Sequence, residues 1–158
     1  MQISTHVRIA FSLFFAAAVL VPASQAATMS QGERALLTAV NAARAAHELA
    51  PLEVDPALTR AAQGHSRTLL RTNTFAHGPF AARLARSGAR GPVLAENLGW
   101  GKGSRATAAG IVRGWLASPG HRANLLRPGF TRIGLGTRTG TFLGVRGATV
   151  VTANFAGR

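Results

Sequence analysis

The change of hydrophobic periodicity near residue 130 constrains the fold of this 158-residue chain more than any other feature. Before it, apolar residues recur at the three- and four-residue spacings of amphipathic helices, as in Leu36, Leu37 and Val40. After Phe130 the chain contains the short β-type runs "TRIGLG", "TFLGVRG" and "ATVVTANFAG", separated by Thr-Gly and Arg-Gly, which is typical of an antiparallel meander. Helices first and antiparallel strands last predict an α+β domain.

Capping signals predict where the first two helices begin. Ser30 and Glu33 stand at the spacing of a capping box, so we expect a helix over residues 31–47. Asp55 is followed by Pro56, an N-cap before a proline whose missing N–H costs nothing in a first helical turn. The apolar face predicted for this second helix consists of Leu58, Ala62, His65 and Leu69.

Three further elements follow from local patterns. Residues 80–86 predict a short helix, and "VLAENLGWG", residues 93–101, predicts one more strand. Ser104 is the expected cap of a helix whose apolar stripe ends at Trp115, and we expect this tryptophan to be part of the core.

The first 26 residues have the organisation of a secretory signal. Arg8 and the amino terminus precede an apolar run, residues 9–21, that is shorter than the roughly 20 residues of a membrane-spanning helix. Ser24 and Ala26 are small residues at the two positions that a signal peptidase recognises. We expect cleavage after Ala26, with residues 27–158 forming one secreted domain, extracellular or periplasmic, without a transmembrane segment. The sequence has no cysteine, which excludes disulfides, and the domain is long enough to bury a core without them.

The charge of the chain is strongly unbalanced, with 18 Lys and Arg against 5 Asp and Glu and a net charge of +13. Such a field attracts cell-wall polymers, anionic lipid headgroups or nucleic acid without sequence specificity. We expect an anionic cell-envelope polymer or lipid as the partner and no specific nucleic acid. The alternative is that the arginines are spread singly over solvated faces, because no run of five or six like charges occurs.

Two polar residues do not fit the apolar patterns around them. Glu96 lies between Leu94 and Leu98, where a carboxylate is costly unless it is paired or hydrogen-bonded. It either caps a nearby backbone turn or faces a polar cavity as an acid, a base or a histidine partner. His77 follows "NTFA" in a stretch rich in turn residues, where packing does not require a histidine.

A third polar residue, His121, occurs at the start of a predicted helix. Ser118 is a natural N-cap and Pro119 a natural first residue, so His121 is the third helical residue, where the helix dipole disfavours imidazolium. A neutral imidazole can accept a proton or a metal ion, although His121 can also simply satisfy a backbone carbonyl. His65 and His47 stand at helical spacing and are interpreted as helix-face residues.

The order of several motifs resembles the CAP superfamily, which comprises cysteine-rich secretory proteins, insect-venom antigens and plant pathogenesis-related proteins, and especially its short bacterial members. The motifs are "NAAR", "FAH", "AENLGWG", a helix ending in Trp, "SPGHRANLL" and "GFTRIGLG", and they span residues 27–158 almost completely. The resemblance implies an α-β-α sandwich with a small antiparallel sheet between helices.

The resemblance also implies that His77, Glu96 and His121 meet in one central cleft. Many animal members carry two histidines and two acidic residues there, and the histidines can bind a divalent metal such as zinc. In this sequence the second acid is replaced by Ser118, three residues after Trp115. The expected site is therefore two imidazoles and one carboxylate, with His77 and His121 as the metal ligands, which suits Zn²⁺ with an open position.

Two functions remain open from the sequence. The favoured one is a binding domain for an extracellular ligand, a lipid or a cell-envelope component, with a structural or regulatory metal, because a pocket needs fewer residues than a catalytic constellation. The other is a hydrolase of peptide or cell-wall substrates, in which a metal activates water and Glu96 moves the proton. Ser118 is not favoured as a nucleophile, because its hydroxyl is expected to cap the helix and no Gly-x-Ser-x-Gly elbow is present.

Overall fold

The computed structural model describes residues 28–157, so the predicted signal segment and the cleavage after Ala26 lie outside the described residues. The helices are α1 (Gln31–Ala45), α2 (Pro56–Thr72), α3 (Phe80–Ser87), α4 (Ala108–Ala117) and α5 (Pro119–Leu125), with a 3-10 helix, η1 (Gly103–Ala106), before α4. The strands are β1 (Glu53–Val54), β2 (Val93–Gly101), β3 (Phe130–Phe142) and β4 (Val145–Gly157). Within residues 28–157, none of the helices combines the length and the hydropathy of a bilayer-spanning segment.

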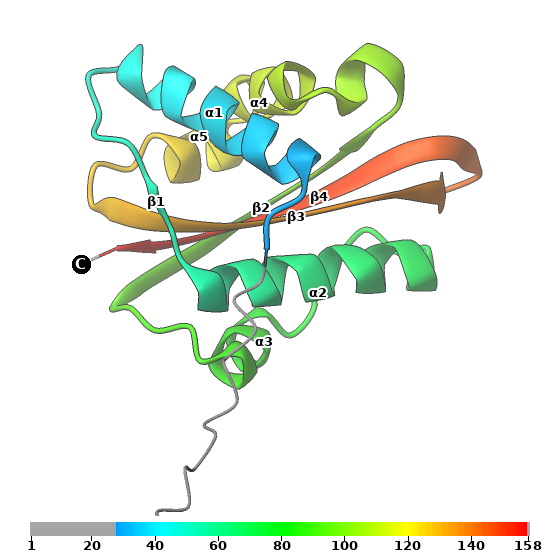
Figure 1. Ribbon diagram of the computed structural model, residues 1–158, viewed down its shortest axis with the longest axis horizontal. Helices are drawn as coiled ribbons and strands as arrows, with labels where there is room; N and C mark the ends of the chain where they lie inside the picture. Colours follow the sequence, from blue (N-terminus) through cyan, green and yellow to red (C-terminus); the bar gives the residue numbers. More distant parts are fainter. Residues whose placement is uncertain (1–27, 158) are drawn as a thin grey trace, which may run out of the picture.

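Two helical layers enclose one sheet (Figure 1). The strands lie in the order β1-β3-β4-β2, with α1, α4 and α5 over one face and α2 and α3 over the other. Strand β4 is buried along most of its length because strands flank it on both sides and helices cover both of its faces. The predicted α+β class and the α-β-α sandwich are confirmed.

The strand predictions need two corrections. The three runs after Phe130 form only two long strands, joined by a tight turn at Leu143 and Gly144, whose φ angles of 47° and 79° suit a two-residue hairpin. The Thr139-Gly140 pair does not turn the chain, because β3 continues through it to Phe142 with a shift of register. The sheet is also not wholly antiparallel, since the two-residue strand β1 pairs in parallel with β3.

The first two helices begin where the sequence predicts. In α1 the Ser30 hydroxyl accepts from the backbone N–H of Glu33 at 3.2 Å, and the Glu33 carboxylate accepts from the backbone of Ser30 at 2.8 Å, which completes the capping box. The helix ends at Ala45, two residues earlier than predicted. The Asp55 carboxylate accepts two backbone N–H bonds in the first turn of α2.

The cap of α4 is not the predicted Ser104. This residue belongs to the 3-10 helix η1, and the helix proper begins after Thr107, whose hydroxyl accepts from the backbone N–H of Gly110 at 3.0 Å. Ser104 and Thr107 are both good capping residues three positions apart, and one 3-10 turn between them is enough to shift the start of the helix.

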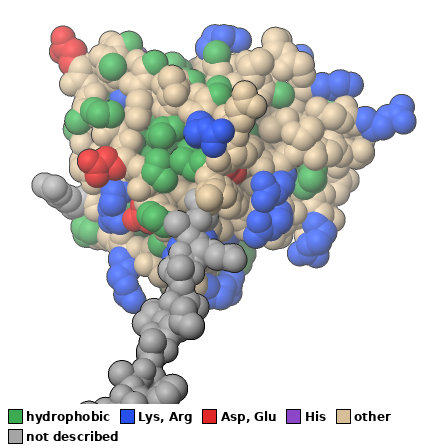
Figure 2. Space-filling view, in the orientation of Figure 1, with side chains coloured by type: hydrophobic (Ala, Val, Ile, Leu, Met, Phe, Trp, Pro, Cys, Tyr) green, Lys and Arg blue, Asp and Glu red, His purple; other side chains and the backbone are tan. Residues whose placement is uncertain are grey.

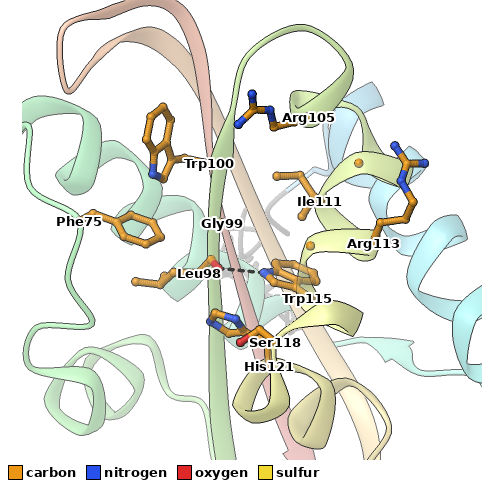
Figure 3. Close-up of a pocket in the computed structure, with 12 residues that line it drawn as sticks. Phe75, Leu98, Gly99, Trp100, Arg105, Ile111, Arg113, Trp115, Ser118 and His121 are labelled. Atoms are coloured by element: carbon orange, nitrogen blue, oxygen red, sulfur yellow. Dashed lines mark hydrogen bonds between the residues drawn. The ribbon is translucent and has the colours of Figure 1, made fainter.

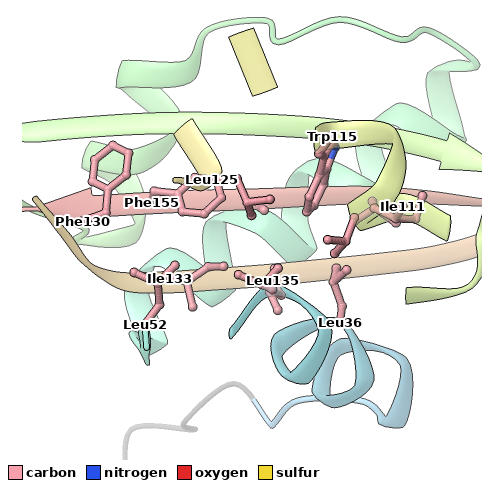
Figure 4. Close-up of a cluster of buried hydrophobic side chains, with 13 residues drawn as sticks. Leu36, Leu52, Ile111, Trp115, Leu125, Phe130, Ile133, Leu135 and Phe155 are labelled. Carbon is pink, nitrogen blue, oxygen red and sulfur yellow. The ribbon is translucent and has the colours of Figure 1, made fainter. Parts of the chain in front are cut away.

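The main core lies between the sheet and the layer of α1, α4 and α5 (Figure 4). Trp115 is only 2% exposed there, and its indole Nε1 donates to the backbone oxygen of Leu98 at 2.8 Å. The prediction that Trp115 is a core residue is therefore confirmed. Its neighbours in this cluster include Leu36, Leu52, Ile111, Leu125, Ile133, Leu135 and Phe155.

Arg44 is a fully buried charged residue that joins α1 to the chain between α5 and β3. Its guanidinium donates to four backbone oxygens, those of Ala50, Leu125, Arg127 and Phe130. Burial lowers the pKa of Arg44, but an arginine stays protonated in proteins, so these carbonyl groups compensate a full buried charge.

The surface is more basic than the net charge alone indicates. Figure 2 shows Lys and Arg side chains distributed over much of one face, with few acidic ones among them. Glu33 and Glu96 are buried, and Asp55 forms an ion pair with Arg132, so only two of the five acidic residues present a free carboxylate to solvent among the described residues.

Helix α2 lies directly on the backbone of β3, at two glycines. A Cβ atom on Gly134 would lie 2.0 Å from the carbonyl carbon of Leu58, and one on Gly136 would lie 2.3 Å from that of Ala62. Both distances are far below van der Waals contact, so the helix can approach this closely only because the strand has no side chain there.

We expect Gly136→Ala to lower the free energy of unfolding by roughly 1–3 kcal/mol or more, because the new methyl group meets backbone atoms that cannot rotate away. Gly129→Ala is the matched control, since a Cβ at Gly129 would meet nothing within 4 Å. Urea denaturation of both variants provides the measurement. Equal midpoints for the two variants would show that α2 does not depend on this contact.

Candidate functional site

Glu96 is a buried carboxylate whose two oxygens are both bonded. Its side chain is 2% exposed and reaches from β2 toward α2 and α3. Oε1 accepts from His77 Nδ1 at 2.8 Å, and Oε2 forms an ion pair with the guanidinium of Arg83. These partners compensate the loss of hydration that burial imposes on the carboxylate.

Arg83 also fixes the loop that carries His77. Besides its bond to Glu96, the guanidinium donates to the backbone oxygen of His77 at 3.0 Å. One side chain of α3 therefore holds both members of the His77–Glu96 pair. Nothing in the sequence pattern distinguishes Arg83 from Arg86, the other arginine of α3.

The bond to Glu96 determines the tautomer of His77. A carboxylate can only accept, so the proton lies on Nδ1 and the lone pair of a neutral ring lies on Nε2. The His77 side chain is 58% exposed. Nε2 is thus the basic atom of this pair that a metal ion or a ligand can reach.

His65 lies closer to Glu96 than its place on a helix face indicated. It is buried on α2, its Nε2 donates to the backbone oxygen of Ala76 at 3.1 Å, and the same atom lies 4.0 Å from Glu96 Oε1. Burial is the main cause that lowers the pKa of His65, while the negative charge of Glu96 opposes it. The helical pattern correctly predicted a buried face, but it could not show that Glu96 lies opposite.

Asn154, on β4, completes the surroundings of the carboxylate. In the amide orientation that satisfies both of its ends, the side-chain nitrogen donates to Glu96 Oε2 at 3.0 Å and the oxygen accepts from the backbone N–H of Ala62 at 3.2 Å. Asn154 is also the residue of β4 that lies opposite Glu96 in the pairing of β2 with β4.

His121 is the third residue of α5, as the sequence predicts. Its backbone oxygen accepts from Asn97 Nδ2 at 2.9 Å, which ties α5 to β2. The pKa of His121 is lowered, first by burial and then by the nearby His77 imidazole. The ring therefore favours the expected neutral form, with burial as the first cause.

Ser118 does not act as the predicted side-chain cap. It is the N-cap residue of α5 by position, yet its hydroxyl makes no capping hydrogen bond. The hydroxyl instead lies at the edge of a groove that also contains His121 (Figure 3).

This groove, of about 570 Å³, follows β2 on the edge that no strand covers, between the loop after α2 and the helix α4 (Figure 3). Its apolar lining is Phe75, Leu98, Trp100, Ile111 and Trp115, and its polar lining is Arg105, Arg113, Ser118 and His121. Glu96 lies outside the groove lining, under the loop that bears His77. The three predicted residues are thus arranged as one bonded pair, His77 and Glu96, with His121 in the adjoining groove.

The arrangement fits a metal site only in part. His77 Nε2 and the neutral ring of His121 are suitable donors for a divalent ion such as zinc. Both oxygens of Glu96 are already engaged, so the carboxylate orients His77 in the manner of a carboxylate–histidine pair and is not a third ligand. In residues 28–157 no group of three or more His, Cys, Asp or Glu is placed to hold a metal ion.

We expect the stability of the protein to fall as the pH drops from about 7.5 to 5, because His65 has a pKa below the value of about 6.5 that it has when unfolded. A lowered pKa means that the neutral ring is favoured in the folded state. The contribution of neutral His65 to the free energy of unfolding is complete above about pH 6.5. It is lost as the pH falls through the pKa that His65 has in the folded protein.

His65→Gln should make this pH dependence shallower, since glutamine can still donate to Ala76 but does not titrate. His47→Gln is the control, because His47 is exposed. Thermal denaturation at several pH values measures the slopes. Equal slopes for wild type and His65→Gln would contradict the assignment.

Two curated proteins of Bacillus subtilis (strain 168) are similar to this chain. The uncharacterized protein YkwD is 32% identical over 119 residues, and the uncharacterized membrane protein YlbC is 33% identical over 109 residues. The alignments cover 72% and 66% of this chain but only 45% and 31% of those proteins. The chain therefore spans less than half the length of the curated relatives that it matches.

Solved structures share the fold. An extracellular protein containing a SCP domain from Bacillus anthracis str. Ames is 28% identical, with a TM-score of 0.65 over 80% of this chain and 40% of that one. An outer surface protein from Borrelia burgdorferi, at 21% identity, matches in fold alone, with a TM-score of 0.65 over 79% of this chain and 91% of that one.

The family model described as the cysteine-rich secretory protein family, CAP, matches residues 37–155. This range contains His77, Glu96 and His121 and every described strand except the last residues of β4. The resemblance that the motifs indicated is confirmed over most of the described residues, and the chain belongs to the cysteine-rich secretory protein (CAP) family.

Proposed function

We propose that this chain is an extracellular binding domain whose groove, beside His77, Glu96 and His121, takes up a component of the cell envelope. The observation that carries the proposal is the groove of about 570 Å³, which combines an apolar lining with a few polar side chains. Preformed hollows of this size and composition are typical of ligand sites.

The location is inferred from the sequence and from a similar protein. The first 26 residues are typical of a secretory signal. The similar B. anthracis protein, which is 28% identical, is described as extracellular. The N-terminal segment and this description support an extracellular or periplasmic location for this chain.

The contacts of Glu96 favour binding over catalysis. A carboxylate that moves a proton must reach the reacting group, yet Glu96 is buried and bonded on both oxygens to His77 and Arg83. A hydrolase of peptide or wall substrates is the second candidate, and the exposed Nε2 of His77, oriented by Glu96, is the observation that favours it. In either case Glu96 acts through His77.

The histidine pair supports a modest metal affinity. His77 and His121 would hold a divalent ion such as zinc, with Glu96 fixing the ring of His77. When bound, the ion would supply a Lewis acid at the end of the groove. Two protein ligands leave the remaining positions to water or to a ligand.

Filling the groove should weaken binding to the cell envelope. A Cβ on Gly114 meets nothing within 4 Å, and this residue lines the groove, so Gly114→Leu places a side chain in the groove without disturbing the core. We expect a loss of about tenfold or more in binding to isolated cell walls or liposomes, measured by co-sedimentation of the purified protein.

Gly120→Leu is the matched control, because Gly120 also lies in a helix with open space around it but does not line the groove. Equal binding by the two variants would contradict a ligand in the groove. Release of soluble fragments from the walls, abolished by Glu96→Gln, would favour the hydrolase.

Zinc binding should require both histidines. In isothermal titration of the purified protein with zinc, we expect His77→Ala and His121→Ala to abolish binding, and Glu96→Gln to weaken it by about 10–100-fold, the usual effect of losing an orienting partner. His47→Ala serves as the control, because His47 is exposed and makes no contact with Glu96. Unchanged affinity in His121→Ala would exclude the metal site.

A further inference from the structure

We propose that the ligand of the groove is an acidic polysaccharide, with one sugar ring against the exposed face of Trp100 and its anionic groups on Arg105 and Arg113. This inference rests on the proposed function, since it names the chemical class of the envelope component. Three observations carry it. They are the exposed aromatic rings, the unpaired arginines, and the free edge of β2, where two backbone oxygens already accept hydrogen bonds.

Trp100 is a large aromatic residue held rigidly at the surface. It is 36% exposed, and its ring packs edge-on against the buried Phe142 at a centroid distance of 5.6 Å. Phe75, 41% exposed, lies on the same side of β2 as Trp100 (Figure 3) and also contacts Phe142, at a centroid distance of 6.3 Å. Fixed, solvent-facing rings of this kind provide a flat apolar surface for the C–H face of a sugar ring at little cost in conformational entropy.

The polar lining of the groove is positive. Arg105 and Arg113 border it, and Figure 3 shows both on the α4 side, across from Trp100. Among the described residues neither guanidinium forms an ion pair or a hydrogen bond. A second hollow of about 440 Å³ shares Trp100 and Arg105 and adds Lys102, so the basic surface continues beyond Trp100.

No acidic residue balances these charges. The sequence contains no Asp or Glu after Glu96, and Glu96 is itself buried and paired with Arg83. The groove therefore presents a positive field without local compensation, and a planar guanidinium can bind a carboxylate or phosphate with two parallel hydrogen bonds. An anionic ligand is the one that this lining complements.

The shape of the groove favours a polymer of sugars over a peptide or an acyl chain. An extended peptide would add to the free edge of β2, but the oxygens of Glu96 and Leu98 on that edge already accept from Asn124 at 3.4 Å and from Trp115 at 2.8 Å. An acyl chain needs an enclosed apolar cavity, whereas this groove is open to solvent and continues into the next hollow.

The test is isothermal titration of the purified protein with an oligogalacturonate, which carries one carboxylate on each ring, and with a neutral maltooligosaccharide of equal length. We expect the acidic oligomer to bind, more weakly as salt rises, and the neutral one to bind at least about tenfold more weakly. Trp100→Ala and Arg105→Gln should each reduce the affinity about tenfold.

Arg67→Gln is the matched control, because it removes the same charge from an exposed position on α2, in the opposite layer. Its affinity should change less than about twofold if the contact is local. Circular dichroism melting checks that each variant is folded, and Arg105→Gln keeps the test decisive if Trp100→Ala unfolds through its contact with Phe142.

Three results would overturn the inference. The first is an equal loss of affinity in Arg67→Gln and Arg105→Gln, and the second is equal binding of the neutral and the acidic oligomer. The third is tighter, Trp100-dependent binding to anionic phosphatidylglycerol vesicles or to a single-stranded oligonucleotide. Binding to cell walls that Gly114→Leu abolishes, without binding of oligogalacturonate, would overturn this inference and leave the proposed function standing. Failure to bind walls and liposomes as well would overturn both.

Discussion

The close approach of α2 to β3 is the constraint on which the rest of the site depends. Gly134 and Gly136 remove the side chains that would hold the helix away from the sheet. Because α2 lies so near, His65 comes within 4.0 Å of Glu96, and the loop and helix that follow carry His77 and Arg83 to the same carboxylate. The geometry of the polar cluster is thus determined by two residues that make no polar contact with it.

Buried charges hold the two helical layers in register with the sheet. On one side the guanidinium of Arg44 bonds four backbone oxygens, and on the other Glu96 accepts from His77 and Arg83. Each charge is costly to bury and is compensated by several partners from different elements. Such bonds are sensitive to position, so they specify how loops and helices dock more strictly than apolar contacts alone.

Local chemistry could be predicted from the sequence, and contacts across the fold could not. The capping box at Ser30 and the core position of Trp115 follow from rules that act within a few residues. Glu96 was identified because a carboxylate among apolar neighbours needs a partner. The sequence did not indicate that this partner is Arg83, because tertiary structure brings the two residues together. Where a prediction was wrong, tertiary structure overrode a local preference: Thr139-Gly140 has turn chemistry, yet pairing with β4 keeps it extended. The two site histidines were linked to Glu96 through the family resemblance, not through their own local patterns.

The hydrogen bonds on the free edge of β2 also affect how copies of this protein behave when they are crowded together. An uncovered edge strand offers N–H and C=O groups to a neighbouring molecule and promotes edge-to-edge aggregation. Here Trp115 and Asn124 occupy two of the outward carbonyl oxygens, those of Leu98 and Glu96. Trp115, which also lines the groove, and Asn124 therefore protect this edge of the sheet from pairing with the edge of another copy.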